Sequence, residues 1–177
     1  MAGNLPGYFV GGAPDATYFL LKTEDTAGEY PVEESNWIAG AEWADSTGID
    51  VINASLGYTV FNDTTLNHRY GELNGRTAIG SRGAIIAASK GMIICNSAGN
   101  EGDGAWHYIG VPADAPGLIA VGAVDYEGQR ASFSSFGPTP DGRIKPAVVA
   151  PGDQVVTAGG LGVQLGLSSG TSLASPM

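Results

Sequence analysis

The stretch Met92-Ile93-Ile94-Cys95-Asn96-Ser97-Ala98 is short, mostly apolar and followed at once by Gly99. A continuous apolar run of this length, bounded by glycine, predicts a strand that is buried on both faces of a sheet. The segment before it, Leu73–Lys90, carries alanines at helical spacing and stops at Gly91, which predicts a helix. The centre of the chain is therefore predicted to be a helix that leads into a buried strand.

The same alternation continues outward in both directions. Pro31 opens a second predicted helix, with Glu33 and Glu34 in its first turn and Gly48 at its end. Further runs rich in strand-forming residues are Ala16–Lys22, Ile49–Ser55, Leu118–Val124, Ala147–Gly152 and Gln154–Ala158. The polar stretch Phe61–Tyr70 is predicted to be a loop. Strands that alternate with helices predict an α/β fold, with a mainly parallel sheet and helices on both faces.

The composition disfavours or excludes several kinds of binding partner and site. The 177 residues carry 18 acidic against 8 basic side chains, a net charge of −10, which disfavours a nucleic-acid partner. The single cysteine excludes an intrachain disulfide and a cysteine-based zinc site. No apolar run reaches the roughly 20 residues that a membrane span needs, and the first ten residues lack the pattern of a signal peptide. We read the acidic first fifty residues as a solvated surface, with a cation-binding face as the alternative.

Three polar segments follow predicted strands or glycine-rich runs, where the ligands of parallel sheets bind. They are Asn53–Tyr58, Asn96–Gly104 and Ser168–Met177. In the last of these, Ser172 follows Gly170 and Thr171, so its hydroxyl could stand at the start of a helix. Backbone N–H groups there would favour a developing anion, although a serine at such a position is often only a helix cap.

The whole string Gly170-Thr171-Ser172-Leu173-Ala174-Ser175-Pro176-Met177 resembles the active-site signature of the subtilisin-like serine proteases, the subtilases. The segments Ser97–Gly102 and Val51–Gly57 resemble the family's oxyanion-hole segment and the strand of its substrate cleft. Further strings in family order are Gly12–Ala16, Ala131–Pro138 and Lys145–Gly152. The similarity runs from about residue 7 to the end of the chain.

This resemblance implies roles for particular residues. Ser172 would be the nucleophile, and Asn100 would donate a hydrogen bond to the oxyanion. The backbone of Ser55, Leu56 and Gly57 would bind substrate. Ala147 stands where the family usually has Asp, so we expect no metal and no cofactor here, and calcium only in a parent protein.

The family places its catalytic Asp and His before the Gly-Ala-Pro string, in the chain order Asp, His, Ser. We therefore expect residues 1–177 to be a partial subtilase catalytic domain that lacks both groups and the helix after the nucleophile. His68 and His107 lack the family's Gly-Thr neighbourhood and are expected to be loop histidines.

The functional hypothesis is a segment of an extracellular or cell-envelope serine endopeptidase, inactive by itself, whose substrates are peptides or proteins. The alternative is a degenerate subtilase-like domain that binds peptides without catalysis. A nucleotide-binding module is disfavoured because neither glycine-rich phosphate motif is present. Apolar surface left uncovered in a partial domain also predicts self-association.

Overall fold

The computed structural model describes residues 1–159 and 164–177. Its main sheet has four parallel strands in the order β3-β4-β5-β6. Their bounds are Val51–Ala54 for β3, Ile93–Ser97 for β4, Ile119–Val124 for β5 and Val148–Pro151 for β6. These strands lie within the runs expected from sequence, and the prediction of an α/β fold built on a parallel sheet is confirmed.

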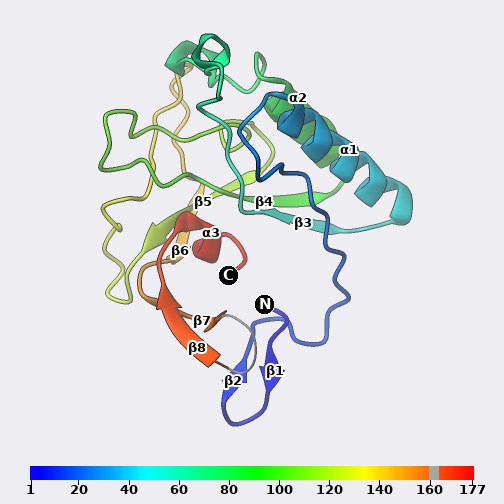
Figure 1. Ribbon diagram of the computed structural model, residues 1–177, viewed down its shortest axis with the longest axis vertical. Helices are drawn as coiled ribbons and strands as arrows, with labels where there is room; N and C mark the ends of the chain where they lie inside the picture. The colour runs from blue at the N-terminus through cyan, green and yellow to red at the C-terminus, as the bar shows by residue number, and fades with distance from the viewer. Residues whose placement is uncertain (160–163) are drawn as a thin grey trace.

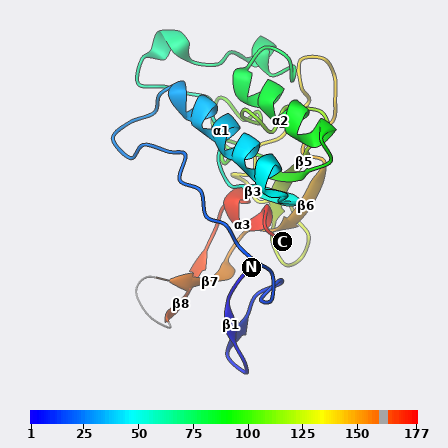
Figure 2. The same ribbon diagram turned by 90° about the vertical axis from the view of Figure 1, so that its right-hand side faces the viewer.

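Helices cover both faces of this sheet (Figures 1 and 2). On one face, α1 (Val32–Thr47) and α2 (Ile79–Ser89) lie side by side and bury a core that includes Trp37, Ala84 and Ile94. On the other face, the short helix α3 (Thr171–Ala174) packs Ala174 against Val121 and Ala123 of β5. The short helix α3 thus lies near the carboxyl ends of the parallel strands, where the polar segments follow them.

Two antiparallel hairpins stand apart from the main sheet in Figure 1. One pairs β1 (Asn4–Leu5) with β2 (Phe9–Val10), and the other pairs β7 (Val155–Gly159) with β8 (Gln164–Ser168). Two 3₁₀ turns, Thr64–Leu66 and Tyr70–Glu72, lie between β3 and α2. Among the helices of the described residues, none is long and apolar enough to cross a membrane.

The second helix begins later than the sequence predicts. The expected helix began at Leu73, but α2 begins at Ile79. The side-chain oxygen of Asn74 accepts hydrogen bonds from the N–H groups of Arg76 and Thr77, at 2.8 and 3.0 Å. Gly75 has a φ of +73°, in the left-handed region. An asparagine side chain that bonds its own following backbone forms a turn in place of a helical start.

The prediction of a strand over Ala16–Lys22 is wrong. These residues belong to no strand, and Leu20 is 92% exposed while Phe19 is 55% exposed. A strand requires a neighbour for its ladder of hydrogen bonds, and the described part of the chain places none beside this segment. The segment still makes apolar contacts: the aromatic rings of Phe19 and Trp43 pack edge to face, with 5.5 Å between their centroids.

A partly buried ion pair between His68 and Glu34 connects α1 to the loop before α2, and it makes the stability of the fold depend on pH. Nε2 of His68 lies 2.6 Å from Oε1 of Glu34, and Nδ1 lies 3.7 Å from Oε2 of Glu72. Burial lowers the pKa of His68, but the hydrogen bond and charge of Glu34, with further help from Glu72 and Asp114, leave that pKa raised above its usual 6.5.

A histidine whose folded pKa is raised stabilises the fold fully below its unfolded pKa and loses that contribution as pH rises through the folded pKa. We expect the free energy of unfolding to fall from about pH 6.5 upward. His68→Gln should remove this dependence and cost on the order of 1–2 kcal/mol at pH 6. Urea titrations across pH 5 to 9 measure it, with His107→Gln as control. A slope unchanged in His68→Gln would contradict the assignment.

Candidate active site

The helix α3 is held over the carboxyl ends of β4 and β6 by its first residues. The N–H of Gly170 donates to the carbonyl of Gly152, directly after β6, at 2.8 Å. Thr171 is fully buried, and its hydroxyl oxygen accepts a hydrogen bond of 3.2 Å from the N–H of Gly99, two residues after the end of β4. These contacts fix the position of Ser172, the next residue along.

Asn100 lies against the start of α3 and has a defined orientation. Its Oδ1 accepts hydrogen bonds from the N–H of Thr171 at 2.9 Å and from the Thr171 hydroxyl at 3.0 Å. The Nδ2 group is therefore the free branch of the amide, and Asn100 is exposed. Within the described residues, neither Nδ2 of Asn100 nor the N–H of Ser172 donates a hydrogen bond to the protein. Two donors are thus available for a ligand beside Ser172.

Ser55 and Ser172 contact each other at the end of β3. The hydroxyl of Ser55 donates to the carbonyl of Ser172 at 2.8 Å, and the hydroxyl of Ser172 donates to the carbonyl of Ser55 at 3.3 Å. The hydroxyl of Ser175 also donates to Oδ1 of Asn53, at 2.7 Å. A peptide carbonyl cannot take a proton at neutral pH, so this arrangement orients the Ser172 hydroxyl without activating it.

The segment after Ser55 is fixed by backbone contacts to β4 and to a later loop. The carbonyl of Leu56 accepts from Nδ2 of Asn96 at 3.1 Å and from the Ser97 hydroxyl at 3.4 Å. After Gly57, Tyr58 forms an antiparallel bridge with Val111. The structure therefore brings Ser55, Asn100 and Ser172 to one place, with Leu56 and Gly57 directly adjoining in sequence. The roles of all five in catalysis or substrate binding stay predictions.

The two histidines are engaged elsewhere. His68 contacts Glu34 and Glu72, as described above. The ring of His107 lies 5.1 Å from that of Phe136 and 4.1 Å from that of Tyr108, between ring centroids. Among the described residues, neither histidine forms a hydrogen bond with Ser172. Both lie outside helices and strands, in keeping with their assignment as loop histidines.

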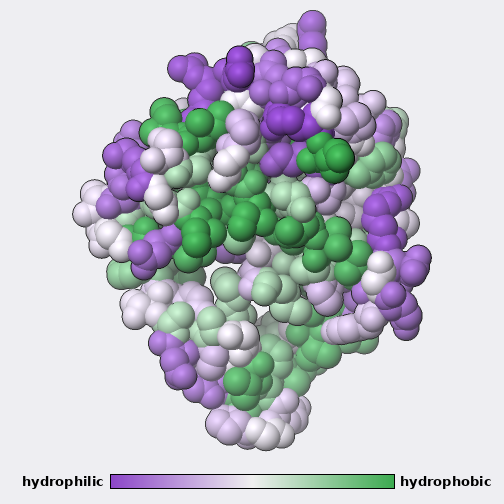
Figure 3. All heavy atoms as spheres, turned by 180° about the vertical axis from the view of Figure 1, so that it is seen from behind, coloured by the Kyte–Doolittle hydropathy of each residue, from purple (hydrophilic) through white to green (hydrophobic). Residues whose placement is uncertain are grey.

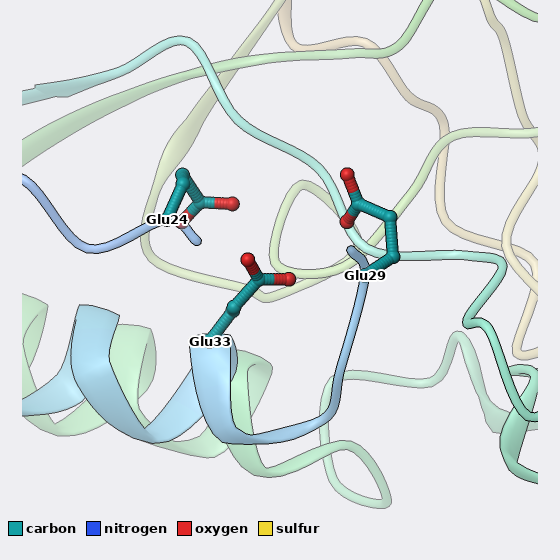
Figure 4. A group of neighbouring side chains, drawn as sticks. All are labelled: Glu24, Glu29 and Glu33. Atoms are coloured by element: carbon teal, nitrogen blue, oxygen red, sulfur yellow. The ribbon is translucent and has the colours of Figure 1, made fainter. Parts of the chain in front are cut away.

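Three side chains from the acidic first fifty residues, for which a cation-binding face was the alternative interpretation, come together at the start of α1 (Figure 4). Carboxylate oxygens of Glu24, Glu29 and Glu33 lie within 4.8 Å of one another. Burial, followed by the charges of Glu33 and Glu24, raises the pKa of Glu29. Oxygen ligands of this kind suit a divalent cation.

Protein donors already occupy two members of this group. Glu33 accepts the N–H groups of Asp25 and Tyr30 at 2.8 and 3.1 Å, and Glu24 accepts the Tyr58 hydroxyl at 2.8 Å. These hydrogen bonds give Glu33 and Glu24 a structural role without an ion. The grouping depends on the packing of the segment before α1 and could not be read from spacing.

The absence of a side chain at Gly152 allows α3 to pack closely against the sheet. A Cβ at Gly152 would lie 2.7 Å from Cβ of Ala123 and 2.9 Å from the carbonyl oxygen of Gly170. Gly152→Ala should therefore push α3 away from the sheet and destabilise the fold by about 1–3 kcal/mol. Gly166→Ala in β8 is the matched control, since its Cβ would meet nothing within 4 Å. Equal urea midpoints for the two variants would show that α3 does not pack as described.

Comparison with known proteins agrees with this arrangement. The subtilase family matches residues 1–177. Subtilisin NAT from Bacillus subtilis subsp. natto is 37% identical over 173 residues, which cover 94% of this chain and 38% of that protein. Subtilisin from Bacillus pumilus is 36% identical, over 94% of this chain and 52% of that protein. The solved structure of the patellamide maturation protease PatA is 28% identical, with a TM-score of 0.62, over 81% of this chain and 46% of that chain.

The prenylagaramide maturation protease PagA is similar in structure, at 25% identity and a TM-score of 0.60, over 81% of this chain and 45% of that chain. The present chain thus covers between about 38% and about half of the length of these curated relatives. The match of the whole chain and the identity of more than a third with two subtilisins agree with the signature around Ser172. The chain belongs to the subtilase family of serine proteases.

Proposed function

We propose that this chain supplies the nucleophile, the oxyanion hole and part of the substrate cleft of a serine endopeptidase. Ser172 attacks the scissile carbonyl of a peptide or protein substrate and forms an acyl-enzyme. Nδ2 of Asn100 and the N–H of Ser172 donate hydrogen bonds to the oxygen of the tetrahedral intermediate. Ser55, Leu56 and Gly57 bind the substrate backbone.

The observation that carries the proposal is the orientation of the Asn100 amide. The hydroxyl and the N–H of Thr171 both donate to Oδ1 of Asn100, so the nitrogen is left to face a ligand. A free donor held beside the hydroxyl of Ser172 is what an oxyanion hole requires, because the donors must be in place before charge develops.

The test is a pair of variants in a protease assembled from this chain and the segments that its relatives carry outside the matched region. Asn100→Ala should lower kcat by about 10²–10³ with little change in KM, a scale that comes from subtilisin itself. Ser172→Ala should abolish labelling by a fluorophosphonate. Asp125→Ala, on an exposed turn far along the chain, should leave both unchanged. A small loss of kcat with a large rise in KM for Asn100→Ala would assign Asn100 to substrate binding.

A peptide-binding domain without catalysis is the second candidate. It is favoured by one observation: among the described residues, the Ser172 hydroxyl donates to the carbonyl of Ser55 and forms no hydrogen bond with a base. In that case the assembled protein would bind a peptide with the same affinity before and after Ser172→Ala, and no acyl-enzyme would form. Mass spectrometry of the protein after exposure to an ester substrate separates the two functions.

We further propose that the parent protein acts outside the cytoplasm, in the extracellular space or the cell envelope. The support is the family resemblance and the similarity to bacterial subtilisins.

A further inference from the structure

Asn96, at the last pair between β3 and β4, is a polar side chain that is fully buried. Figure 3 shows hydrophilic side chains around the upper part and along the sides of the molecule's rear face, where water can satisfy them. The residues two positions before and after Asn96, Ile94 and Ala98, belong instead to the hydrophobic core. A polar side chain in such surroundings requires hydrogen bonds from the protein.

The Asn96 amide is satisfied at its nitrogen and not at its oxygen. Nδ2 donates to the carbonyl of Leu56 at 3.1 Å and to the carbonyl of Ser97 at 2.8 Å. Within the part of the chain that the structure describes, the buried Oδ1 has no hydrogen-bond partner. An unsatisfied buried oxygen destabilises a fold, so a gain in stability does not account for an asparagine at this position. The hydrogen bond to Leu56 is the feature that calls for another explanation.

This hydrogen bond lies where β3 and β4 part. Their pairing ends with Ala54 opposite Asn96, and the N–H and carbonyl of Tyr58 pair with a later loop. Between these two anchors, side chains hold the Leu56 carbonyl to β4. Nδ2 of Asn96 is the closer donor, and the Ser97 hydroxyl lies at 3.4 Å. Asn96 therefore continues the connection between the strands beyond their last backbone pair.

Holding the Leu56 carbonyl also fixes the direction of the next N–H group. The carbonyl of Leu56 and the N–H of Gly57 belong to one planar trans peptide group, so they point in opposite directions. Because the carbonyl points toward β4, the N–H of Gly57 points away from it. Among the described residues, neither the N–H nor the carbonyl of Gly57 bonds to the protein. Glycine permits many backbone conformations, so this peptide group could rotate without the bond from Asn96.

We propose that Asn96 is a positioning residue for substrate binding, which holds the Leu56 carbonyl and thereby aims the N–H of Gly57 at a bound peptide. That N–H donates to a main-chain carbonyl of the peptide and needs no reorientation on binding. The peptide is recognised here by its main chain and not by a side chain. This inference rests on the proposed role of Gly57 in substrate binding, and it adds a residue that acts through Leu56.

The test compares two substrates of the assembled protease described above. A tetrapeptide p-nitroanilide has main-chain carbonyls that can pair with Gly57, whereas p-nitrophenyl acetate reacts with a nucleophilic serine but has no peptide group. Asn96→Leu removes the donor and keeps the approximate size of the side chain. We expect it to lower kcat/KM for the tetrapeptide about tenfold, mainly through KM, which is the scale of one lost hydrogen bond. Hydrolysis of the acetate should change by less than about twofold.

Asn74→Leu is the matched control, because Nδ2 of Asn74 also donates to a backbone carbonyl at 3.1 Å, that of Gly71, outside the segment Ser55–Gly57. It should leave both substrates unchanged. Asn96→Ala is the second variant, which removes the same donor without adding a larger apolar side chain. If the two substrates lose activity equally in the Asn96 variants, the residue has a structural role and the proposal is wrong.

A binding measurement separates this inference from the catalytic proposal. In the Ser172→Ala background, calorimetry with the uncleaved tetrapeptide amide should show about tenfold weaker binding after Asn96→Leu. An unchanged affinity overturns the role of Asn96, even where a fluorophosphonate labels Ser172 in the parent protein. A tenfold loss of affinity without any labelling of Ser172 would support Asn96 as a positioning residue of a peptide-binding domain and would reject the catalytic proposal.

Discussion

The 177 residues on their own are expected to show peptide hydrolysis about 10⁶-fold below that of a complete protease of this family, a scale set by subtilisin itself. A serine hydroxyl is a weak nucleophile at neutral pH unless a base takes its proton. The Ser172 hydroxyl donates to a carbonyl, and among the described residues both histidines have other partners. The oxyanion donors alone could leave a residual acceleration on the order of 10³–10⁴ over water.

A chromogenic peptide assay and fluorophosphonate labelling of the purified chain measure this expectation. Ser172→Ala provides the background of each assay. Turnover or labelling in the wild-type chain that disappears in Ser172→Ala would prove that a base reaches Ser172. His107→Ala would then be the next variant, because His107 lies in the loop that follows the Asn100 segment.

The sequence predicts the main sheet well because each of its strands is a short apolar run that ends at a polar or glycine-rich segment. Ile93–Ser97 and Ile119–Val124 lie inside such runs and pair side by side. The helix after Pro31 is predicted equally well, because Gly48 supplies the left-handed residue, with φ at +76°, that ends it. These features depend on local composition, which a single sequence contains.

The features that the sequence missed depend on partners distant along the chain. Ala16–Lys22 has the composition of a strand, but pairing requires a neighbour that composition does not reveal. The segment Gln164–Ser168 alternates Leu165 and Leu167 with polar or small residues, but it is only five residues long, and β8 is established by its antiparallel pairing with β7. The late start of α2 follows from one side chain, Asn74, that bonds its own backbone.

The candidate site also combines features that the local sequence predicts with features that depend on contacts between distant residues. Ser172 and Asn100 were found from local strings, whereas the hydrogen bonds of Thr171 that orient the Asn100 amide became visible only in three dimensions. The contact between Ser55 and Ser172 joins residues that are 117 positions apart. Local motifs therefore identified the groups, and the fold supplied their mutual orientation.

The largest loss of stability from one substitution is expected at Asp114, whose side chain is fully buried. Its carboxylate accepts hydrogen bonds from the N–H of Gly75 at 2.7 Å and from the hydroxyl of Ser81. Burial raises the pKa of Asp114, while those hydrogen bonds and the nearby Arg143 charge oppose the rise. Asp114→Ala leaves two buried donors without an acceptor, and such groups cost about 1–3 kcal/mol each.

We therefore expect Asp114→Ala to lower the free energy of unfolding by about 2–4 kcal/mol in urea titrations. Asp125→Ala is the matched control, since Asp125 also accepts two N–H groups, from Glu127 and Gln129, but on an exposed turn. Water replaces those lost bonds, so the control should lose less than about 1 kcal/mol. A similar loss in both variants would mean that water reaches Asp114, and that the contact between the segment before α2 and the loop after Val111 is looser than its hydrogen bonds indicate.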